Sequence, residues 1–395
     1  MEEINKMKKL FVVFTAIALV SVFALTASAA EWDFYGSARV ATIYHHNDDD
    51  NSGINEYDIT KTIGKDDGGT NMDLQGNSRV GAKVKVNDEI GGRFEYGTGV
   101  NIRHLYGTWD FDGGQLLIGQ TYTPIYQGYS DQVWNTDEGM ASWGNTDPGR
   151  SPMIQIKTGG FKVALIRPQV NANTNKGLPS LPDKYTLTTA STPEVDVDTT
   201  SGVTTISSSV VDAYLPKLEV SYSMKTDEFF FDVSAGAQTY KIEIDTINFD
   251  ESVNSFVIGA DFGMNFGIAG FVVKGHYSVN GKSYGLISAT DNQSVLNVAA
   301  NDLYKNETYA VQALLNVNPS DTLAIQAGVG YSASELDRTG YKKDDSTCYY
   351  AQAALTVVPG LYIIPEVGYI DEMDSSSGAD QGSTFYAGAK WQINF

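Results

Sequence analysis

The stretch FYAGAKWQINF, residues Phe385 to Phe395, alternates between two kinds of side chain. One set is apolar throughout: Phe385, Ala387, Ala389, Trp391, Ile393 and Phe395. The other set carries the polar groups and one glycine: Tyr386, Gly388, Lys390, Gln392 and Asn394. Successive side chains of a β-strand point to opposite faces of the sheet. The stretch therefore predicts a strand with one wall that suits hydrocarbon and another that suits water.

The same alternation recurs along most of the chain. Apolar positions two residues apart include Trp32 and Phe34, Val80 and Ala82, Phe229 and Phe231, Phe256 and Ile258, Tyr309 and Val311, and Leu323 and Ile325. The positions between them hold polar side chains, among them Asp232, Asp261, Lys274, Gln312 and Gln326. Counting such segments predicts about 16 strands, enough to enclose an aqueous channel.

Short turns and long loops alternate between these segments. The short turns are rich in turn-forming residues: 87–89, 112–113, 159–160, 226–227, 267–268, 318–320 and 359–360. The long connections are polar: 44–77, 122–150, 169–212, 241–252, 281–305, 332–347 and 371–382. This asymmetry is typical of bacterial outer-membrane barrels. A soluble β-sandwich or propeller is the alternative, but the chain shows no repeat of the length that propeller blades require.

The first residues have the pattern of a secretory signal. Lys6, Lys8 and Lys9 precede the apolar run Leu10 to Leu25, and Ala27-Ser28-Ala29 has the small residues of a cleavage site. A membrane anchor is the alternative, although the run is short for a spanning helix. We therefore expect residues 1–29 to be a removed signal peptide and 30–395 to be an all-β, antiparallel transmembrane β-barrel in the cell outer membrane.

Composition excludes several other classes. The formal net charge of -21 argues against nucleic-acid binding, and the single cysteine, Cys348, excludes an internal disulfide framework. None of the 4 histidines sits in a metal-binding or nucleophile motif. We expect no enzyme activity, no cofactor and no metal. A lipid hydrolase that pairs His104 with a serine stays open as an alternative.

Three consecutive motifs carry a family resemblance. Residues 78–83 (SRVGAK), 103–107 (RHLYG) and 114–120 (GQLLIGQ) resemble successive strands of the general trimeric porins of Gram-negative bacteria. The resemblance covers the mature chain in outline and residues 78–168 in motif. It implies 16 strands, a homotrimer, and a third extracellular loop that folds inward and narrows the channel.

The resemblance also implies where the channel is narrowest. Basic residues on the wall would face acidic residues on the inward loop, which would be Tyr122 to Arg150. The wall residues are Arg39, Arg79, Arg103 and Arg150, and the loop acids are Asp131, Asp137, Glu138 and Asp147. Strand parity independently puts Arg39, Arg79 and Arg103 on the water-facing wall. The loop lacks the family's Pro-Glu-Phe-Gly-Gly type of motif.

Two residues conflict with a regular barrel. Pro365 lies inside a strand pattern, where it removes a ladder hydrogen bond, and we interpret it as a bulge. His104 falls on the nominally outward face, and we interpret it as an interface residue.

The sequence leaves three functions open. The first is a porin that forms a water-filled channel for passive diffusion of small hydrophilic solutes and ions. The second is a substrate-selective porin with a sugar or anion site, to which the inward tyrosines Tyr35, Tyr362 and Tyr386 would contribute. The third is a non-conducting structural or adhesive barrel. The expected partners are outer-membrane lipid and lipopolysaccharide. Divalent cations could link lipopolysaccharide to acidic loops such as Asp48 to Gly53, although that loop lacks the final Glu of a calcium site.

Overall fold

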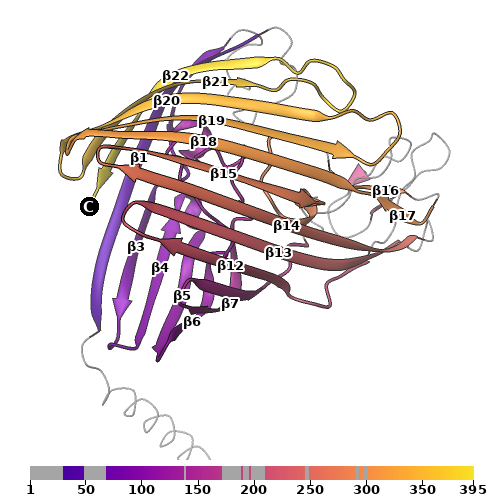
Figure 1. Cartoon of the computed structure of the whole chain (residues 1–395), viewed down its shortest axis with the longest axis horizontal. Helices are drawn as coiled ribbons and strands as arrows, with labels where there is room; N and C mark the ends of the chain where they lie inside the picture. Colours follow the sequence, from indigo (N-terminus) through magenta and orange to yellow (C-terminus); the bar gives the residue numbers. More distant parts are fainter. Residues whose placement is uncertain are drawn as a thin grey trace, which may run out of the picture.

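The computed structural model describes residues 30–48, 68–137, 139–170, 188–189, 195–196, 210–244, 249–290, 293–297 and 300–395. Their main feature is a closed antiparallel β-barrel of 16 strands (Figure 1). The barrel closes where β1 (Glu31–Asn47) pairs with β22 (Ser383–Asn394), in a register that runs from Ser37 opposite Asn394 to Asn47 opposite Thr384. The prediction of an all-β barrel of about 16 strands is confirmed.

The remaining wall strands follow one another around the barrel in chain order. They are β3 (Arg79–Lys85), β4 (Ile90–Gly97), β5 (Ile102–Phe111), β6 (Gly114–Tyr122), β7 (Arg150–Thr158), β8 (Phe161–Ile166), β12 (Lys217–Lys225), β13 (Phe229–Ile244), β14 (Phe249–Phe266), β15 (Ala269–Val279), β18 (Asn306–Ser320), β19 (Leu323–Leu336), β20 (Asp344–Val358) and β21 (Leu361–Asp371).

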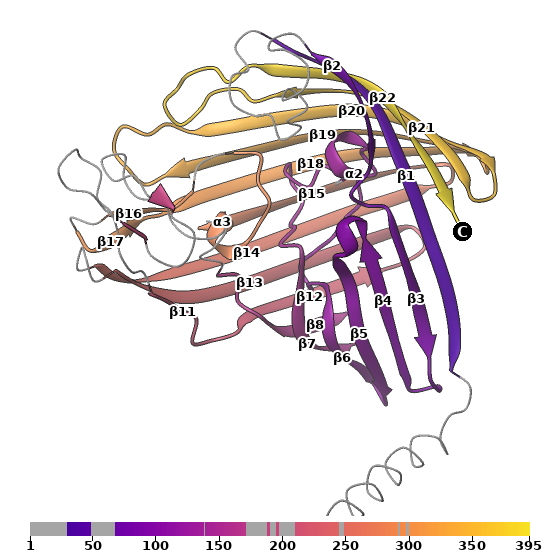
Figure 2. The same ribbon diagram turned by 180° about the vertical axis from the view of Figure 1, so that it is seen from behind.

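Several shorter elements complete the described part of the chain. Figure 2 shows β2 (Gly69–Leu74), which pairs with the second half of β1. The short strand β11 (Val210–Asp212) pairs with β13 in the same way. Two small hairpins stand apart from the main sheet, one formed by β9 (Thr188–Thr189) and β10 (Val195–Asp196), the other by β16 (Val295–Asn297) and β17 (Asp302–Tyr304). The helical turns are η1 (Thr98–Val100), α2 (Trp134–Asp137) and α3 (Gly281–Tyr284).

The alternation in the sequence separates the two faces of the wall. Val311 on β18 is 46% exposed, whereas its neighbour Gln312 is 2% exposed. The same contrast holds on β13 between Phe231 and Asp232, and on β15 between Val273 and Lys274. The barrel therefore has an apolar exterior and a polar interior, as the strand parity predicted. Among the described residues, no helix is long and apolar enough to cross a membrane.

The two rims of the barrel differ. Tight connections join β3 to β4, β5 to β6, β7 to β8, β12 to β13, β14 to β15, β18 to β19 and β20 to β21, and the C-terminus lies at this rim (Figure 1). The longer connections lie at the other ends of the strands. One predicted turn was displaced: β18 continues through Asn318 to Ser320, and the turn falls at Asp321 and Thr322.

His104 corrects the sequence-based interpretation, because its side chain is buried inside the wall. The pairing of β4 with β5 changes register between Glu95 opposite His104 and Tyr96 opposite Ile102. Arg103 is the extra residue of this β-bulge, and a bulge re-aims the side chains beside it. Arg103 and His104 therefore both lie on the inner face, 7% and 5% exposed.

Pro365 is not at a bulge, which also corrects the interpretation. It pairs with Ala389 of β22 in the regular register of that ladder. On its other side the ladder with β20 has the same register at Gln352 opposite Glu366 and at Leu355 opposite Ile363, with no pair recorded between them. A local interruption of the ladder therefore accommodates the missing N–H donor.

Candidate functional site

A cavity of about 960 Å³ lies against the inner wall of the barrel. Seven of the eight residues that the sequence singled out line it: Arg39, Arg79, Arg103, Arg150, Asp131, Asp137 and Asp147. The eighth, Glu138, lies outside the described residues, as do the signal segment 1–29 and positions 49–53 of the acidic loop. The structure therefore brings the predicted wall residues and loop acids into one site.

The basic side of the cavity is built by neighbouring strands. Arg39 comes from β1, Arg79 from β3, Arg103 from β5, and Arg150 begins β7. Lys390 of β22 joins them across the closure of the barrel, where it pairs with Ala41. The sequence pattern places Lys390 on the polar face of the strand Phe385 to Phe395. The pairing of β22 with β1 then brings it to this site.

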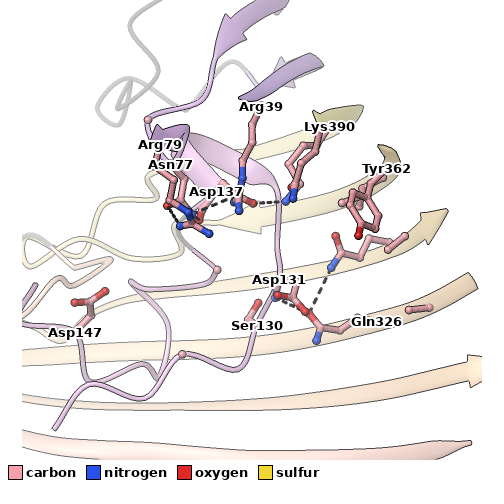
Figure 3. A pocket seen from close by; sticks show the side chains of 18 of the residues that line it. Arg39, Asn77, Arg79, Ser130, Asp131, Asp137, Asp147, Gln326, Tyr362 and Lys390 are labelled. Carbon is pink, nitrogen blue, oxygen red and sulfur yellow. Dashed lines mark hydrogen bonds and ion pairs between the residues drawn. The ribbon is translucent and has the colours of Figure 1, made fainter. Parts of the chain in front are cut away.

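Asp137 connects the 123–149 loop to the wall. Its Oδ2 accepts a short hydrogen bond from Arg39, and its Oδ1 lies 2.7 Å from the Lys390 Nζ (Figure 3). All three side chains are at most 10% exposed. Asp137 ends α2 in the left-handed region, at φ 68°, which aspartate tolerates better than most residues. One carboxylate thus neutralises two cations of the wall.

Glu95 of β4 contacts arginines on β3, β4 and β5. It is fully buried, and its Oε1 lies 2.7 Å from the Arg103 Nε while its Oε2 lies 3.8 Å from the Arg79 Nε. The Arg93 Nη2 is also 2.7 Å from Oε2. Asn77 accepts hydrogen bonds from Arg79 and Arg103, at 3.0 and 2.5 Å. Glu95 was not among the residues predicted from the sequence. It pairs with His104 across the β4–β5 ladder, beside a bulge that strand alternation does not reveal.

Arg150 is held by aromatic rings. Its guanidinium carbon lies 4.1 Å from the centre of the Tyr122 ring, and the Tyr122 hydroxyl accepts a short hydrogen bond from its Nη2. Tyr122 in turn stacks on Tyr126, with ring centres 3.8 Å apart and nearly parallel planes. Within the described part of the chain, Arg150 has no carboxylate within ion-pair distance. Its charge is therefore directed to the cavity and to ring faces.

The 123–149 loop provides the acidic side of the cavity. The Asp131 backbone N–H donates to Gln326 Oε1 at 2.7 Å (Figure 3). The Asp147 carboxylate accepts from the Gly149 N–H at 2.7 Å. Asp131 is accessible from the cavity, yet protein surrounds it and displaces bulk water. This desolvation raises the pKa of the Asp131 carboxyl, and Lys390 opposes the shift.

Many contacts fix the loop against the inner wall. The Glu366 carboxylate of β21 accepts from the backbone N–H groups of Val133 and Trp134, at 2.7 and 3.0 Å. Trp143 Nε1 donates to Ser346 of β20 at 3.0 Å. Beside it, Gly144 adopts φ 82° and approaches β18 so closely that an added Cβ would lie 2.5 Å from the Gln312 backbone nitrogen.

The three inward tyrosines differ in their accessibility. Tyr386 is buried, accepts a hydrogen bond from Gln132 at 2.9 Å and stacks on Trp134. Tyr35 donates to Glu95 at 2.8 Å. Tyr362 lines the cavity. A continuous aromatic track that includes all three is therefore not formed.

The surroundings of His104 and of the acidic side chains bear on the hydrolase alternative. The hydroxyl next to His104 Nδ1 is that of Thr121, 2.9 Å away, rather than a serine. Within the described ranges, no three or more His, Cys, Asp and Glu residues gather in a way that could hold a metal ion. What the cavity offers is a charged, polar surface on which solutes could bind or pass.

Comparison with solved structures gives the same architecture. The outer membrane channel DcaP of Acinetobacter baumannii is 16% identical, with 93% of this chain and 98% of that chain covered and a TM-score of 0.66. OmpF of Salmonella typhi is 12% identical, with coverage of 92% and 97% and a TM-score of 0.53. An anion-selective porin from Comamonas acidovorans is 9% identical, with coverage of 93% and 100% and a TM-score of 0.51.

In sequence, by contrast, no protein-family model and no curated protein matches the chain. Identities this low establish the fold alone. The resemblance seen in the sequence is therefore confirmed at the level of architecture: the chain has the 16-stranded barrel fold of the outer-membrane porins.

Proposed function

We propose that the protein is an outer-membrane porin, a water-filled channel through which small hydrophilic solutes and ions diffuse passively. Residues 30–395 form the channel domain, residues 1–29 direct export and are removed, and the 123–149 loop folds inward to set the narrowest passage. The observation that carries this proposal is the polar cavity of about 960 Å³ against the inner wall of a barrel whose outer face is apolar.

Passage through such a site needs no covalent step. Cations on the wall and carboxylates on the loop, facing each other across a narrow passage, create a transverse field. Water and polar solutes orient in that field, whereas apolar solutes lose hydration without compensation. The residues that act in this way are Arg39, Arg79, Arg103 and Arg150 on the wall and Asp131, Asp137 and Asp147 on the loop.

The charge balance favours anions, which supports the substrate-selective alternative. The cavity lining holds five cationic side chains and three carboxylates among the described residues. Asp137 is already shared by Arg39 and Lys390, and Arg150 faces aromatic rings instead of an acid. The buried Glu95 carboxylate is shared by Arg79, Arg93 and Arg103, so it compensates only one of their three charges. Positive charge therefore remains in excess beside Arg79, Arg103 and Arg150. A small carboxylate or phosphate could meet these arginines in bidentate geometry.

The assembly that we propose is a homotrimer in contact with outer-membrane lipid and lipopolysaccharide. The outer face of β1 supports this proposal, because after Trp32 and Phe34 it carries the small residues Gly36, Ala38 and Thr42. Small residues allow close approach between subunits. Conductance in steps of three would support the trimer, and single steps would contradict it.

Recording from purified protein in planar bilayers tests the channel. We expect ion-conducting steps, and a reversal potential under a salt gradient that shifts toward cations when Arg79→Gln and Arg103→Gln are combined. Removing two positive charges from the passage lowers its attraction for anions. The matched control is Lys85→Gln, which removes an exposed charge paired with Asp88 at a tight turn.

The possible outcomes distinguish a general diffusion porin, a substrate-selective porin and a non-conducting barrel. Saturation of the current by one solute class favours the selective porin over general diffusion. A folded protein that gives no conductance supports the non-conducting barrel. An unchanged reversal potential in the double variant would show that Arg79 and Arg103 do not line the passage.

A further inference from the structure

A second loop lies beside the 123–149 loop. The connection from β15 to β18 begins at Asn280 and carries the short helix α3. Tyr284 at the end of α3 is fully buried, and Leu286 is 6% exposed. Both belong to an apolar cluster with Ile125 of the 123–149 loop and Val257 of β14. The two loops therefore share a small core of their own.

Glu219 is a point of the wall to which both loops attach. This carboxylate on β12 is fully buried. Its Oε1 accepts the Tyr284 hydroxyl at 2.7 Å, and its Oε2 accepts the Ile125 backbone N–H at 3.3 Å. Lys217, also fully buried, lies 3.4 Å from Glu219 and 4.1 Å from the centre of the Tyr284 ring. A buried charge is unfavourable unless it is paired. Lys217 and Glu219 provide this pairing for each other.

Backbone hydrogen bonds extend the contact toward the cavity. The Ile287 N–H donates to the Asp147 carbonyl at 3.1 Å, and the Ala289 N–H donates to the Ser142 carbonyl at 3.2 Å. Asp147 is one of the acids at the cavity, and Ile287 itself lines it. The second loop thus both borders the passage and positions an acid of the first loop.

We propose that residues 280–290 form a second constriction element, which with the 123–149 loop closes one side of the lumen and confines passage to the basic cavity. Glu219 and Tyr284 are the positioning residues of this element. The inference rests on the proposed channel function and adds a determinant of channel size. It differs from the single inward loop that the sequence resemblance implied.

The first test measures the size of the passage. Tyr284→Ala removes the ring and its hydrogen bond to Glu219, so the second loop loses its attachment to the β12 carboxylate and the centre of its apolar contact with Ile125. We expect single-channel conductance to rise by about 1.5-fold or more, and uncharged polymers of larger radius to enter the channel. Tyr284→Phe, which keeps the ring, should give a smaller increase.

The control is Tyr214→Ala. Tyr214 also donates to a carboxylate, that of Asp212 at 2.9 Å, but it is 71% exposed and is not among the residues that line the cavity. This variant should conduct like the parent protein. Equal conductance and polymer cut-off in Tyr284→Ala and Tyr214→Ala would overturn the proposal.

A second measurement does not depend on conduction. Ser142→Cys and Ala289→Cys, combined with Cys348→Ser, place two cysteines at hydrogen-bonded neighbours in the two loops. Oxidation should link them, whereas Ser142→Cys combined with the exposed Ser377→Cys should stay unlinked. Absence of the link in the first pair contradicts the docking of the loops. If the disulfide forms but neither the parent protein nor any variant conducts, the proposed channel function is wrong and the docking of the two loops is still supported.

Discussion

At the scale of single residues, the cavity holds carboxylates with very different surroundings. Asp137 is nearly buried between Arg39 and Lys390, so its charge is compensated locally. Asp131 reaches the cavity, and its backbone rather than its carboxylate bonds to Gln326. Two aspartates six positions apart in one loop therefore have different roles. Asp137 attaches the loop, and Asp131 contributes an exposed charge to the cavity.

The raised pKa of Asp131 predicts a pH-dependent selectivity. A carboxyl with a raised pKa takes up a proton at a higher pH than an ordinary aspartate does. Lowering the pH should therefore neutralise Asp131 before the exposed acids of the protein. We expect the reversal potential under a salt gradient to move toward anions as this occurs. Asp131→Asn should show the anion-shifted reversal potential already at neutral pH. Its reversal potential should no longer change in the pH range where Asp131 takes up its proton in the parent protein.

The control for this prediction is Asp88→Asn. Asp88 lies at an exposed tight turn, where its hydrogen bond with Lys85 lowers the pKa of its carboxyl. Its removal should leave the titration unchanged. A parent-like pH profile in Asp131→Asn would show that another group carries the effect.

At the scale of elements, the 123–149 loop depends on side chains that the strands hold in place. The Glu366 carboxylate accepts hydrogen bonds from two backbone N–H groups at the start of α2. It thus acts like an N-cap side chain, although it belongs to β21 and not to the loop. Hydrogen bonds to a charged group contribute about 1.5–3 kcal/mol each. The loop conformation is thus specified by residues more than 200 positions away in the sequence.

Glu366→Ala should release the start of α2 from the wall. Because two donors then lose their buried acceptor, we expect the open-channel current to become noisier and its mean conductance to change. Bilayer recordings at fixed voltage measure both. Glu335→Ala, at an exposed position of β19, provides the matched control. A quiet, parent-like current in Glu366→Ala would show that the remaining contacts suffice to hold the loop.

At the scale of the whole molecule, closure joins the two ends of the chain. β22 pairs with both β21 and β1, and the Phe395 backbone exchanges hydrogen bonds with Gly36 at 2.6 and 3.1 Å. Closure leaves no free edge in the wall. The strand FYAGAKWQINF is therefore necessary for the cylinder as well as typical of it.

Removal of residues 385–395 should prevent closure. β1 and β21 would each expose an unpaired edge, which is unfavourable in lipid. We expect the truncated chain to lose the difference in gel migration between heated and unheated samples that marks a folded barrel. Deletion of residues 375–379, in the loop between β21 and β22, should preserve that difference. A heat-sensitive shift in the truncated chain would contradict this role of β22.

The barrel could be predicted from the sequence, because strand parity is a local property. Val311 and Gln312 point to opposite faces whatever the rest of the chain does, so alternation predicted the apolar exterior and placed Arg39 and Arg79 inside. The porin resemblance added Arg150 and the loop acids. His104 was assigned to the wrong face because the extra residue of the bulge at Arg103 reverses the alternation of side chains. A single sequence does not reveal where a strand contains such an extra residue.

Which charges face one another depends on how the chain packs in three dimensions. Glu95 beside Arg103, Lys390 beside Asp137, and Glu219 beneath Tyr284 are pairings between strands and loops that the barrel brings together. The loop–wall pairs depend on the paths of residues 123–149 and 280–290, which follow from many weak contacts at once. Local patterns specify strands, whereas the composition of the passage depends on how the closed wall and both loops pack.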